Sequence, residues 1–521
     1  MNGSKILLWY RNLSTEWKMV LAGAVTGLSF PPVSLAFLAW IGLVPLIRAW
    51  LQSNSPSRSG YYGFLWSLGF LFVTLYWVAF NNGTYWWAAL MSMIALVLFL
   101  SLNYIFIGWW FGWLQARWGR LALWSLPLIW VSVEFLRSFG TLGFPWIALA
   151  NSQTVLLLPI QNAEITGIYG ISMWVVLLNV LLVEYLEGQE TQRAALTLVV
   201  IFLFPWVGGW LLLPEVPPAT FKVGVVQPNV NALEKWVPEV RREHFEQLNA
   251  LTTTLAADSP QVVFWPEAAT PAYLRKGGRP YLLAIQEVLR ELKFPVVTGM
   301  PDYRRQSGDE VRYYNAVGYI DSLGLREQQY NKIQLVPFGE YIPLSGWIPA
   351  LKALNLGQGN FAQGDDYTVF EVDSVPFSVG VCFETTFPGL NRNFVRAGAT
   401  FLVGVVNDAW YRTSSGPYQH AAQFRYRAVE LRRPVVRAAN TGISLVIDQA
   451  GRTVARLGLN EEGAFTAGIA PATGLTFYAR YGDLFAWLTV LAALGSTGWA
   501  YRDKLSAWIP MGQAKARGDG A

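Results

Sequence analysis

The apolar segment Trp86–Leu114, which contains no charged residue, most constrains the fold of this chain. A bilayer core of about 30 Å requires about 20 apolar residues in one helix, so the segment predicts a membrane span rather than a core helix of a large soluble protein. Seven further apolar segments follow the same pattern: Val20–Phe30, Leu35–Trp50, Tyr61–Phe80, Leu121–Phe139, Ile168–Tyr185, Ala194–Leu213 and Leu484–Tyr501. The sequence therefore predicts an eight-helix transmembrane bundle.

The composition restricts the class of protein further. The chain is 53% hydrophobic and only 14% charged, whereas typical globular proteins contain roughly 25% charged residues. A net charge of +5 without a basic stripe does not favour nucleic acid as a partner. A single cysteine and no Cys/His spacing of the zinc type predict no disulfide and no metal, and without a phosphate-loop motif we expect no cofactor.

The basic residues predict the orientation, because Lys and Arg collect in cytoplasmic loops. With eight spans and both termini cytoplasmic, these residues all fall on one side: Lys5, Arg11, Lys18, Arg48, Arg58, Arg117, Arg120, Arg193, Arg502, Lys504, Lys515 and Arg517. The segment between the seventh and eighth spans then lies on the opposite, extracytoplasmic face. We expect a multi-pass protein of the bacterial cell (inner) membrane with a periplasmic domain.

Residues 220–478 have the pattern of a water-soluble domain, between a membrane part at 1–213 and an eighth span at 484–501 with a tail at 502–521. Short buried strands at Phe221–Val226, Val262–Trp265 and Thr400–Val406 alternate with helices at Glu239–Ala257 and Tyr418–Leu431. Such alternation predicts a layered α/β fold. The last strands that we expect, Val435–Ala438 and Ile443–Ile447, would close the sheet.

Two polar features occur in the membrane part. Glu134 and Arg137 lie three residues apart on one predicted helix face, where charges are costly and often functional. A local ion pair near the interface is the simpler interpretation. Gly143-Phe144-Pro145-Trp146 lies in an outward loop, where Trp commonly anchors a protein at the membrane surface.

Three short segments supply reactive side chains, and each follows a predicted strand. Trp265-Pro266-Glu267 offers a carboxylate, Asn331–Glu340 includes Lys332, and Val381–Glu384 contains the lone cysteine, Cys382. A lone Cys is more often a small buried hydrophobe. A carboxylate that accepts the thiol proton and a lysine that stabilises an oxyanion would make it a nucleophile.

These three segments, in this order, resemble the Glu-Lys-Cys segments of the nitrilase (carbon–nitrogen hydrolase) superfamily. The resemblance implies an αββα sandwich in which Glu267 is the general base, Lys332 the oxyanion stabiliser and Cys382 the nucleophile. Together with the eight spans, the whole chain resembles the membrane-bound branch that N-acylates bacterial lipoproteins. Gly143–Trp146 and Val336–Pro343 are similar to patterns of that branch, whereas Phe383 stands where its members would have Tyr.

The resemblance also implies roles for other residues. Glu340 would orient Lys332 or the incoming amine, and Glu384 would support the nucleophile loop or cap the following turn. Trp236 would cover the substrate site, and Gly143 and Trp146 would belong to the substrate-binding loop. Loss of the Tyr hydroxyl at Phe383 removes any hydrogen bond from that position.

The implied reaction is transfer of an acyl chain from a phospholipid, phosphatidylethanolamine by resemblance, through a thioester on Cys382. The acceptor would be the α-amino group of the N-terminal diacylglyceryl-cysteine of an apolipoprotein, and the enzyme would be a monomer. A membrane-anchored amidase with the same triad is one alternative, and an inactive lipid-binding scaffold is another.

Overall fold

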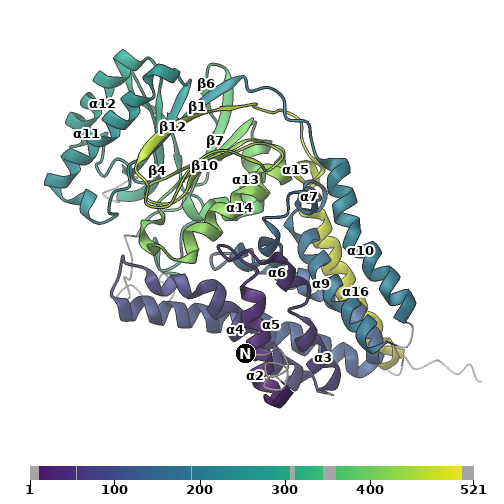
Figure 1. The fold of residues 1–521 in the computed structure, drawn as a ribbon. Coiled ribbons are helices and arrows are strands. Elements are labelled where there is room, and N and C mark those ends of the chain that lie inside the picture. Colours follow the sequence, from purple (N-terminus) through teal and green to yellow (C-terminus); the bar gives the residue numbers. More distant parts are fainter. Residues whose placement is uncertain (1–10, 54, 189–190, 306–310, 344–359, 507–521) are drawn as a thin grey trace, which may run out of the picture.

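The computed structural model describes residues 11–53, 55–188, 191–305, 311–343 and 360–506. It contains a helical bundle, formed by the N-terminal residues and the C-terminal helix, and a domain with two β-sheets (Figure 1). The predicted tail at 507–521, with Lys515 and Arg517, and the N-terminal Lys5 lie outside the described residues.

The bundle contains long apolar helices and several shorter ones. Its main helices are α2 (Thr15–Gly27), α3 (Val44–Gln52), α4 (Pro56–Leu75), α5 (Trp86–Trp118), α6 (Leu126–Leu136), α9 (Ile168–Glu187), α10 (Thr191–Leu212) and α16 (Leu484–Ser506). Short helices α7 (Leu157–Ile160) and α8 (Ala163–Thr166) precede α9, and 3₁₀ turns η1 (Ala36–Trp40), η2 (Tyr76–Phe80), η3 (Gly119–Ser125), η4 (Pro145–Ile147) and η5 (Leu149–Gln153) connect the rest.

The predicted count of eight spans is not confirmed. Among the described residues, five helical segments are long and apolar enough to cross a membrane: Pro56–Phe80, Trp86–Leu136, Ile168–Glu187, Gln192–Leu212 and Leu484–Arg502. The first, second and fifth predicted spans correspond to α2, to η1 with α3, and to α6, which are shorter than the roughly 20 residues that a straight span requires. Helix α5 runs on past the predicted end at Leu114, and the chain turns at Gly119 with a φ of +57°.

Two six-stranded sheets form the core of the domain. One has the order β12-β1-β2-β3-β4-β5, with β1 (Phe221–Gln227), β2 (Val262–Phe264), β3 (Val296–Arg305), β4 (Val311–Asp321), β5 (Gly324–Asn331) and β12 (Gly463–Ile469). The other has the order β11-β10-β9-β8-β7-β6, with β6 (Phe370–Val372), β7 (Val375–Val381), β8 (Phe401–Val406), β9 (Val435–Ala439), β10 (Ser444–Ile447) and β11 (Thr453–Leu457).

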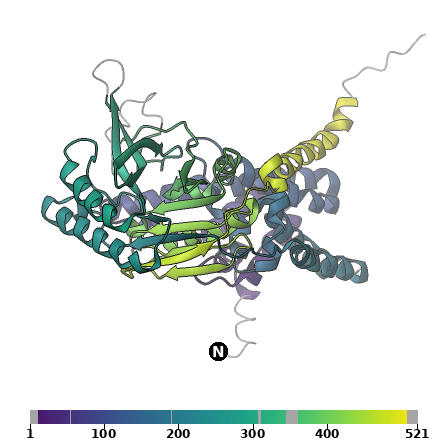
Figure 2. The ribbon, with the colours of Figure 1, turned by 90° about the horizontal axis from the view of Figure 1, so that it is seen from above.

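The sheets pack face to face through aromatic and branched side chains. The ring of Phe264 meets that of Phe377 at 5.5 Å, and Phe221 meets Phe401 at 5.7 Å. Helices α11 (Pro238–Thr254) and α12 (Arg279–Leu292) cover the first sheet, as Figure 2 shows from above, and α13 (Pro388–Arg396) and α14 (Ser415–Leu431) cover the second. The predicted two-sheet, four-layer αββα architecture is therefore confirmed.

The prediction that the strand at Ile443–Ile447 closes the sheet is wrong. Strand β11 follows at the edge of the second sheet, and β12 returns to pair antiparallel with β1 of the first, placing Phe221 opposite Ile469. This chain reversal joins the two sheets before the chain enters α16.

Helix α14 is the layer between the second sheet and the bundle (Figure 1). It contacts η2, η5 and α8 of the bundle, and it packs on β9 and β10 of the sheet. The Tyr426 hydroxyl donates to the Ala150 carbonyl, and Gln419 donates to the carbonyls of Pro31 and Thr74. These buried hydrogen bonds seat the domain directly on the bundle.

Candidate active site

Cys382 lies where strand β7 ends, at the first residue of the 3₁₀ turn η9 (Cys382–Thr386). Its φ is +52°, a conformation that costs energy for a residue with a side chain and that clusters at functional sites. The residue is partly exposed. The strand therefore places the thiol in a strained, half-buried turn.

Lys332 directly follows strand β5 and is almost fully buried. Its Nζ donates to Glu340 Oε1 at 2.8 Å and lies 3.7 Å from Glu267 Oε1. Glu267 follows β2, so the ends of two strands of the first sheet bring the two side chains together. Gly299 of β3 allows the backbone of Glu267 to pack closely against this strand, because a Cβ at position 299 would lie 2.6 Å from the Glu267 Cα.

Asn315 joins the two carboxylates from the middle of strand β4. Its Nδ2 donates to Glu267 Oε1 and to Glu340 Oε1, both at 2.8 Å. The other Glu340 oxygen accepts from the Val336 amide at 2.8 Å. Both acids are thereby fixed around the ammonium. Asn315 was not predicted from the sequence, because an Asn within a strand carries no distinctive spacing.

The charges of Glu267, Lys332 and Glu340 also act on the thiol of Cys382. Burial and the carboxylate of Glu267 raise the pKa of its thiol well above the usual range, whereas Lys332 opposes that shift. Burial disfavours the Lys332 charge, but Glu340 and Glu267 outweigh it and raise the pKa of the lysine. The resting site therefore holds an ammonium and a neutral thiol, and the thiol needs a base in order to react.

Glu384 is fully buried and ties the cysteine turn to the lysine loop. Its Oε1 accepts from the Tyr330 hydroxyl and from the amides of Ile333 and Gln334, and its Oε2 accepts from the Val381 amide. Burial raises the pKa of Glu384 to about 7. Its contacts extend beyond the local turn to both sides of Lys332.

A second polar cluster, formed by His420, Asp408, Arg437 and Thr385, lies behind the nucleophile. His420 Nε2 lies 3.1 Å from the Cys382 carbonyl oxygen, and the Thr385 hydroxyl donates to the same oxygen at 2.8 Å. His420 Nδ1 lies 2.9 Å from Asp408 Oδ1, and Arg437 donates to the other oxygen of Asp408. The sequence analysis gave these residues no role, although His420 is one of only two histidines.

Phe383 faces the membrane loop that follows α6. Its ring lies 6.1 Å from Phe144, 6.4 Å from Trp146 and 4.9 Å from Phe387. Trp146 is buried, its ring centroid lies 5.2 Å from that of His420 in a tilted arrangement, and its indole N–H donates to Gln419. The interpretation of Trp146 as a membrane-surface anchor is therefore wrong, because the catalytic domain covers the indole.

Gly143 lies in a tight turn of the membrane part, whereas Trp236 lies in a partly exposed 3₁₀ turn of the domain. The Gly143 amide donates to the Gly140 carbonyl in a tight turn, where a Cβ would lie 2.6 Å from the Ser138 oxygen. Trp236 ends the 3₁₀ turn η6 (Glu234–Trp236) with 40% of its side chain exposed. Its neighbour Lys235 is instead buried and donates to the carbonyl of Ala268, the residue after Glu267.

Glu134 and Arg137 do not form the predicted local ion pair. Glu134 Oε1 accepts from the Trp130 indole and the Leu149 amide, while Arg137 Nε donates to the Phe144 carbonyl. Both side chains are buried. Each therefore holds one end of the loop that carries Trp146.

Comparisons with known proteins agree with the combination of a two-sheet domain and a helical membrane part. Residues 222–475 match the carbon-nitrogen hydrolase family model, so the domain has the nitrilase-like fold. Residues 22–181 match the model of the apolipoprotein N-acyltransferase N-terminal domain. The molecule is thus a carbon–nitrogen hydrolase domain joined to the helical part of a membrane acyltransferase.

Full-length relatives identify the particular family. Apolipoprotein N-acyltransferase of Geobacter metallireducens is 35% identical over 93% of this chain and 95% of its own length. The proteins of the same name from Chlorobaculum tepidum and Methylococcus capsulatus are 33% and 32% identical, over 93% and 91% of this chain and 96% and 94% of their own lengths. The chain belongs to the apolipoprotein N-acyltransferase family and is an N-acyltransferase.

Two solved structures are similar to about half of this chain. An amidase from Nesterenkonia sp. AN1 is 17% identical over 53% of this chain and 98% of its own, with a TM-score of 0.37. Nit3 of Saccharomyces cerevisiae, a member of the nitrilase superfamily, is 18% identical over 49% of this chain and 91% of its own, with a TM-score of 0.37.

Proposed function

We propose that this enzyme transfers a fatty acyl chain from a phospholipid to the α-amino group of an N-terminal diacylglyceryl-cysteine, through a thioester on Cys382. The observation that carries the proposal is the ammonium of Lys332, held between the carboxylates of Glu267 and Glu340 within electrostatic reach of the Cys382 thiol. The names of the full-length relatives support an apolipoprotein as the acceptor.

In the first half-reaction, Glu267 takes the Cys382 proton while the sulfur attacks the acyl ester carbon. Because the thiol has a raised pKa, proton removal and attack take place together rather than through a stored thiolate. Lys332 stabilises the oxyanion, together with backbone amides of the nucleophile turn. The ester C–O bond then breaks, Glu267 returns the proton to the leaving oxygen, and lysophospholipid departs.

In the second half-reaction, the lipoprotein amine attacks the thioester carbon. An amide C–N bond forms, the C–S bond breaks, and Glu267 passes the amine proton to the sulfur. Glu340 keeps Lys332 oriented through both steps from its 2.8 Å contact. Thioester to amide is downhill, so the cycle requires no nucleotide or other cofactor.

The hydrophobic surroundings favour transfer over hydrolysis. Phe383, Phe144 and Trp146 form an apolar boundary between the nucleophile turn and the bundle. Water exclusion from such a site protects a reactive acyl intermediate. We assign Gly143 and Trp146 to the shaping of this boundary, and the exposed Trp236 to a cover over the substrate.

The remaining features of the proposal concern the setting of the enzyme. We take phosphatidylethanolamine as the donor, the bacterial inner membrane as the location and a monomer as the active state. Both termini are cytoplasmic and the domain is periplasmic. Glu384 supports the nucleophile and lysine loops and does not itself exchange protons with substrate.

Trapping of the intermediate tests the proposal. Purified enzyme incubated with radiolabelled phospholipid and no acceptor should carry a fatty acyl group on Cys382 that hydroxylamine removes. Addition of a diacylated lipopeptide should transfer the label to the peptide amine, and Cys382→Ala should lose both signals. Release of free fatty acid at the same rate with and without lipopeptide would instead indicate an amidase-like hydrolase. An active Cys382→Ala enzyme without an adduct would exclude the thioester.

A further inference from the structure

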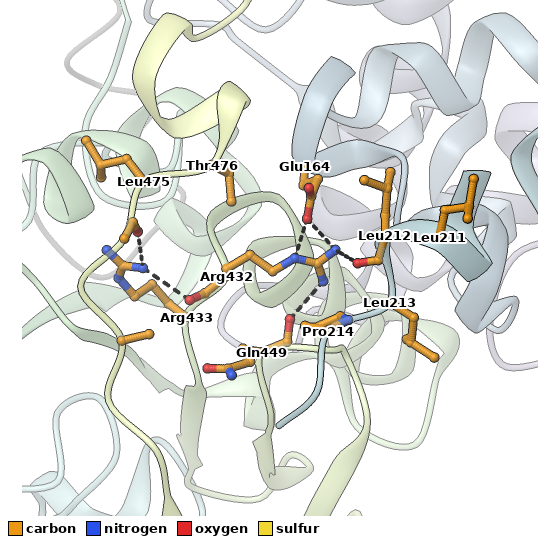
Figure 3. A pocket seen from close by; sticks show the side chains of 12 residues that line it. Glu164, Leu211, Leu212, Leu213, Pro214, Arg432, Arg433, Gln449, Leu475 and Thr476 are labelled. Atoms are coloured by element: carbon orange, nitrogen blue, oxygen red, sulfur yellow. Dashed lines mark hydrogen bonds and ion pairs between the residues drawn. The ribbon is translucent and has the colours of Figure 1, made fainter. Parts of the chain in front are cut away.

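A cavity of about 500 Å³ lies at the junction of the domain and the bundle (Figure 3). One wall is the end of α10 with the residues that follow it, Leu211–Pro214. Another is the segment from Ala472 to Thr476, which leads into the short helix α15 (Phe477–Tyr481) before α16. The chain therefore leaves the membrane part and returns to it on either side of this cavity.

This position corresponds to the membrane surface. Leu211 at the end of α10 has 70% of its side chain exposed, and Leu475 across the cavity has 41% exposed. Helix α10 presents most of its apolar surface outward. Lipid headgroups meet acyl chains at the ends of such helices, so the mouth of the cavity lies at headgroup depth.

The cavity contains an arginine whose charge has no acidic partner. Arg433 is 2% exposed, and its Nε and Nη1 donate only to backbone carbonyls, those of Ala399, Leu431, Arg432 and Gly474. Among the described residues, Arg433 has no ion pair with a carboxylate and no hydrogen bond from Nη2. Burial lowers the pKa of Arg433 to about 10, which still leaves it charged.

The neighbouring Arg432, in contrast to Arg433, has an acidic partner. Arg432 forms an ion pair with Glu164 and also donates to the Gln161 side chain and the Leu212 carbonyl. The charge of Arg432 is therefore neutralised within the protein. The net positive charge of the cavity wall is that of Arg433.

The cavity lined by Arg433 is also lined by a buried hydrogen-bond acceptor, the side-chain oxygen of Gln449. Gln449 lines the same cavity, its side chain is 8% exposed, and its Oε1 has no hydrogen-bond partner among the described residues. A buried polar atom without a partner costs free energy unless a ligand or water satisfies it. The lining of the cavity thus includes a cation and a hydrogen-bond acceptor (Figure 3).

The cavity is distinct from the catalytic site. Cys382 and Asp408 follow the carboxyl ends of the parallel strands β7 and β8, whereas Arg433 precedes the amino end of β9. Helix α14 runs from one end to the other, and a helix of its length spans about 25 Å. A ligand at Arg433 therefore cannot share the binding position of the reacting ester.

We propose that this cavity binds the headgroup of a membrane phospholipid as a non-substrate ligand, with Arg433 donating to the phosphodiester and Gln449 accepting from the headgroup ammonium or hydroxyl. Guanidinium groups bind phosphate oxygens with strong, charge-assisted hydrogen bonds. The acyl chains lie against the exposed leucines at the end of α10. Such a lipid fastens the domain to the bilayer at the end of α14 opposite the nucleophile.

Photocrosslinking tests the proposal. Phosphatidylethanolamine with a diazirine near its glycerol should crosslink to the segments around Arg433, Gln449 and Leu475 in full-length Cys382→Ala protein, which does not consume the probe. Gly474→Leu should abolish that crosslink, because a Cβ at Gly474 meets no atom within 4 Å and the side chain would fill the cavity. Arg433→Gln should weaken lipid binding roughly tenfold, as loss of a charge-assisted hydrogen bond predicts.

Gly389→Leu is the matched control, since position 389 also has open space around it. It should leave the crosslink unchanged, and crosslinks near Cys382 should persist in all variants. An unchanged crosslink around Arg433 in Gly474→Leu would overturn the proposal. Displacement of the probe by inorganic phosphate as effectively as by unlabelled phosphatidylethanolamine would overturn the lipid assignment, because it would identify a soluble phosphate as the ligand.

Discussion

His420 Nε2 lies 3.1 Å from the carbonyl oxygen of Cys382, so a side chain of α14 holds the backbone of the nucleophile itself. Because Cys382 has a positive φ, its turn needs such contacts to keep the strained conformation. His420→Gln should slow acylation by about 10- to 100-fold, the range expected for small misplacement of a reacting group.

The rate of Cys382 alkylation by iodoacetamide distinguishes positioning from general destabilisation. His420→Gln should change the alkylation rate of the folded enzyme as well as its acylation rate. His244→Gln is the control, because that buried histidine contacts the Ala269 carbonyl instead. Normal acylation in folded His420→Gln would contradict the positioning role.

Asp408 should make the stability of the enzyme depend on acid pH. Burial opposes its charge, but Arg437 and His420 outweigh that effect and hold the pKa of Asp408 at about 2, against an ordinary value of 3.8. A depressed carboxyl pKa contributes stability above the ordinary value, and that stability is lost as the pH falls toward the folded value. The contribution is roughly 2 kcal/mol at neutral pH.

Thermal unfolding in detergent should therefore show an apparent Tm that falls between pH 4 and pH 2 for the wild type. Asp408→Asn should have a lower Tm already at pH 7, because Arg437 is left buried without its partner. Its Tm should also change less between pH 4 and pH 2. Parallel curves for the two proteins would show that Asp408 does not carry this pH dependence.

Glu384→Gln should disrupt the connection between the nucleophile and Lys332. Three donors converge on Glu384 Oε1 and a fourth meets Oε2, so an amide NH₂ in either position would face a donor. We expect roughly 100-fold slower acylation, since the lysine loop and the cysteine turn would separate. Tyr330→Phe removes only one of the four donors and should have a smaller effect. The exposed Glu371→Gln serves as the control, and equal rates for all three variants would refute this role.

The positions of the triad residues were predictable because each follows a strand. A buried apolar run that leads into a polar residue is a local signal, and Glu267 and Cys382 have it, whereas Lys332 follows a largely polar strand. Asn315 has no such signal, since it lies inside β4 and its amide reaches carboxylates from two other segments. Packing of distant segments, rather than any local pattern, determines that contact.

The errors in the fold prediction have similar physical causes. Strand β12, Gly463–Ile469, is rich in small residues and pairs with a strand far back in the sequence, so its apolar alternation is weak and its partner is non-local. Helices α2, α3 and α6 are shorter than a straight membrane span, and hydropathy alone does not locate the ends of such helices. The burial of Trp146 was unpredictable because α14, which covers it, comes much later in the chain.

Gly299→Ala should impair the general base without removing a reactive group. The added Cβ would lie 2.6 Å from the Glu267 Cα and from the Ala268 amide nitrogen, so the backbone that carries the base must move. Acylation should fall by about 100-fold if Glu267 shifts by about 1 Å, measured as the rate of adduct formation with labelled phospholipid. Gly389→Ala, at a position with open space, should retain wild-type activity. Comparable rates for the two alanine variants would show that the position of Glu267 is not critical.

Single-cysteine labelling should establish the orientation of the protein in the membrane. Arg48 of α3 and Arg120, just after α5, form ion pairs with Glu184 and Glu187 near the end of α9, and the positive-inside rule predicts that this side of the bundle is cytoplasmic. In a Cys382→Ala background, Leu323→Cys in the exposed turn between β4 and β5 should react with a membrane-impermeant maleimide once the outer membrane is opened. Ala116→Cys, at an exposed position near the end of α5, should react only after the inner membrane is also disrupted. Labelling of Ala116→Cys before that step would reverse the topology, and with it the periplasmic location of the catalytic domain.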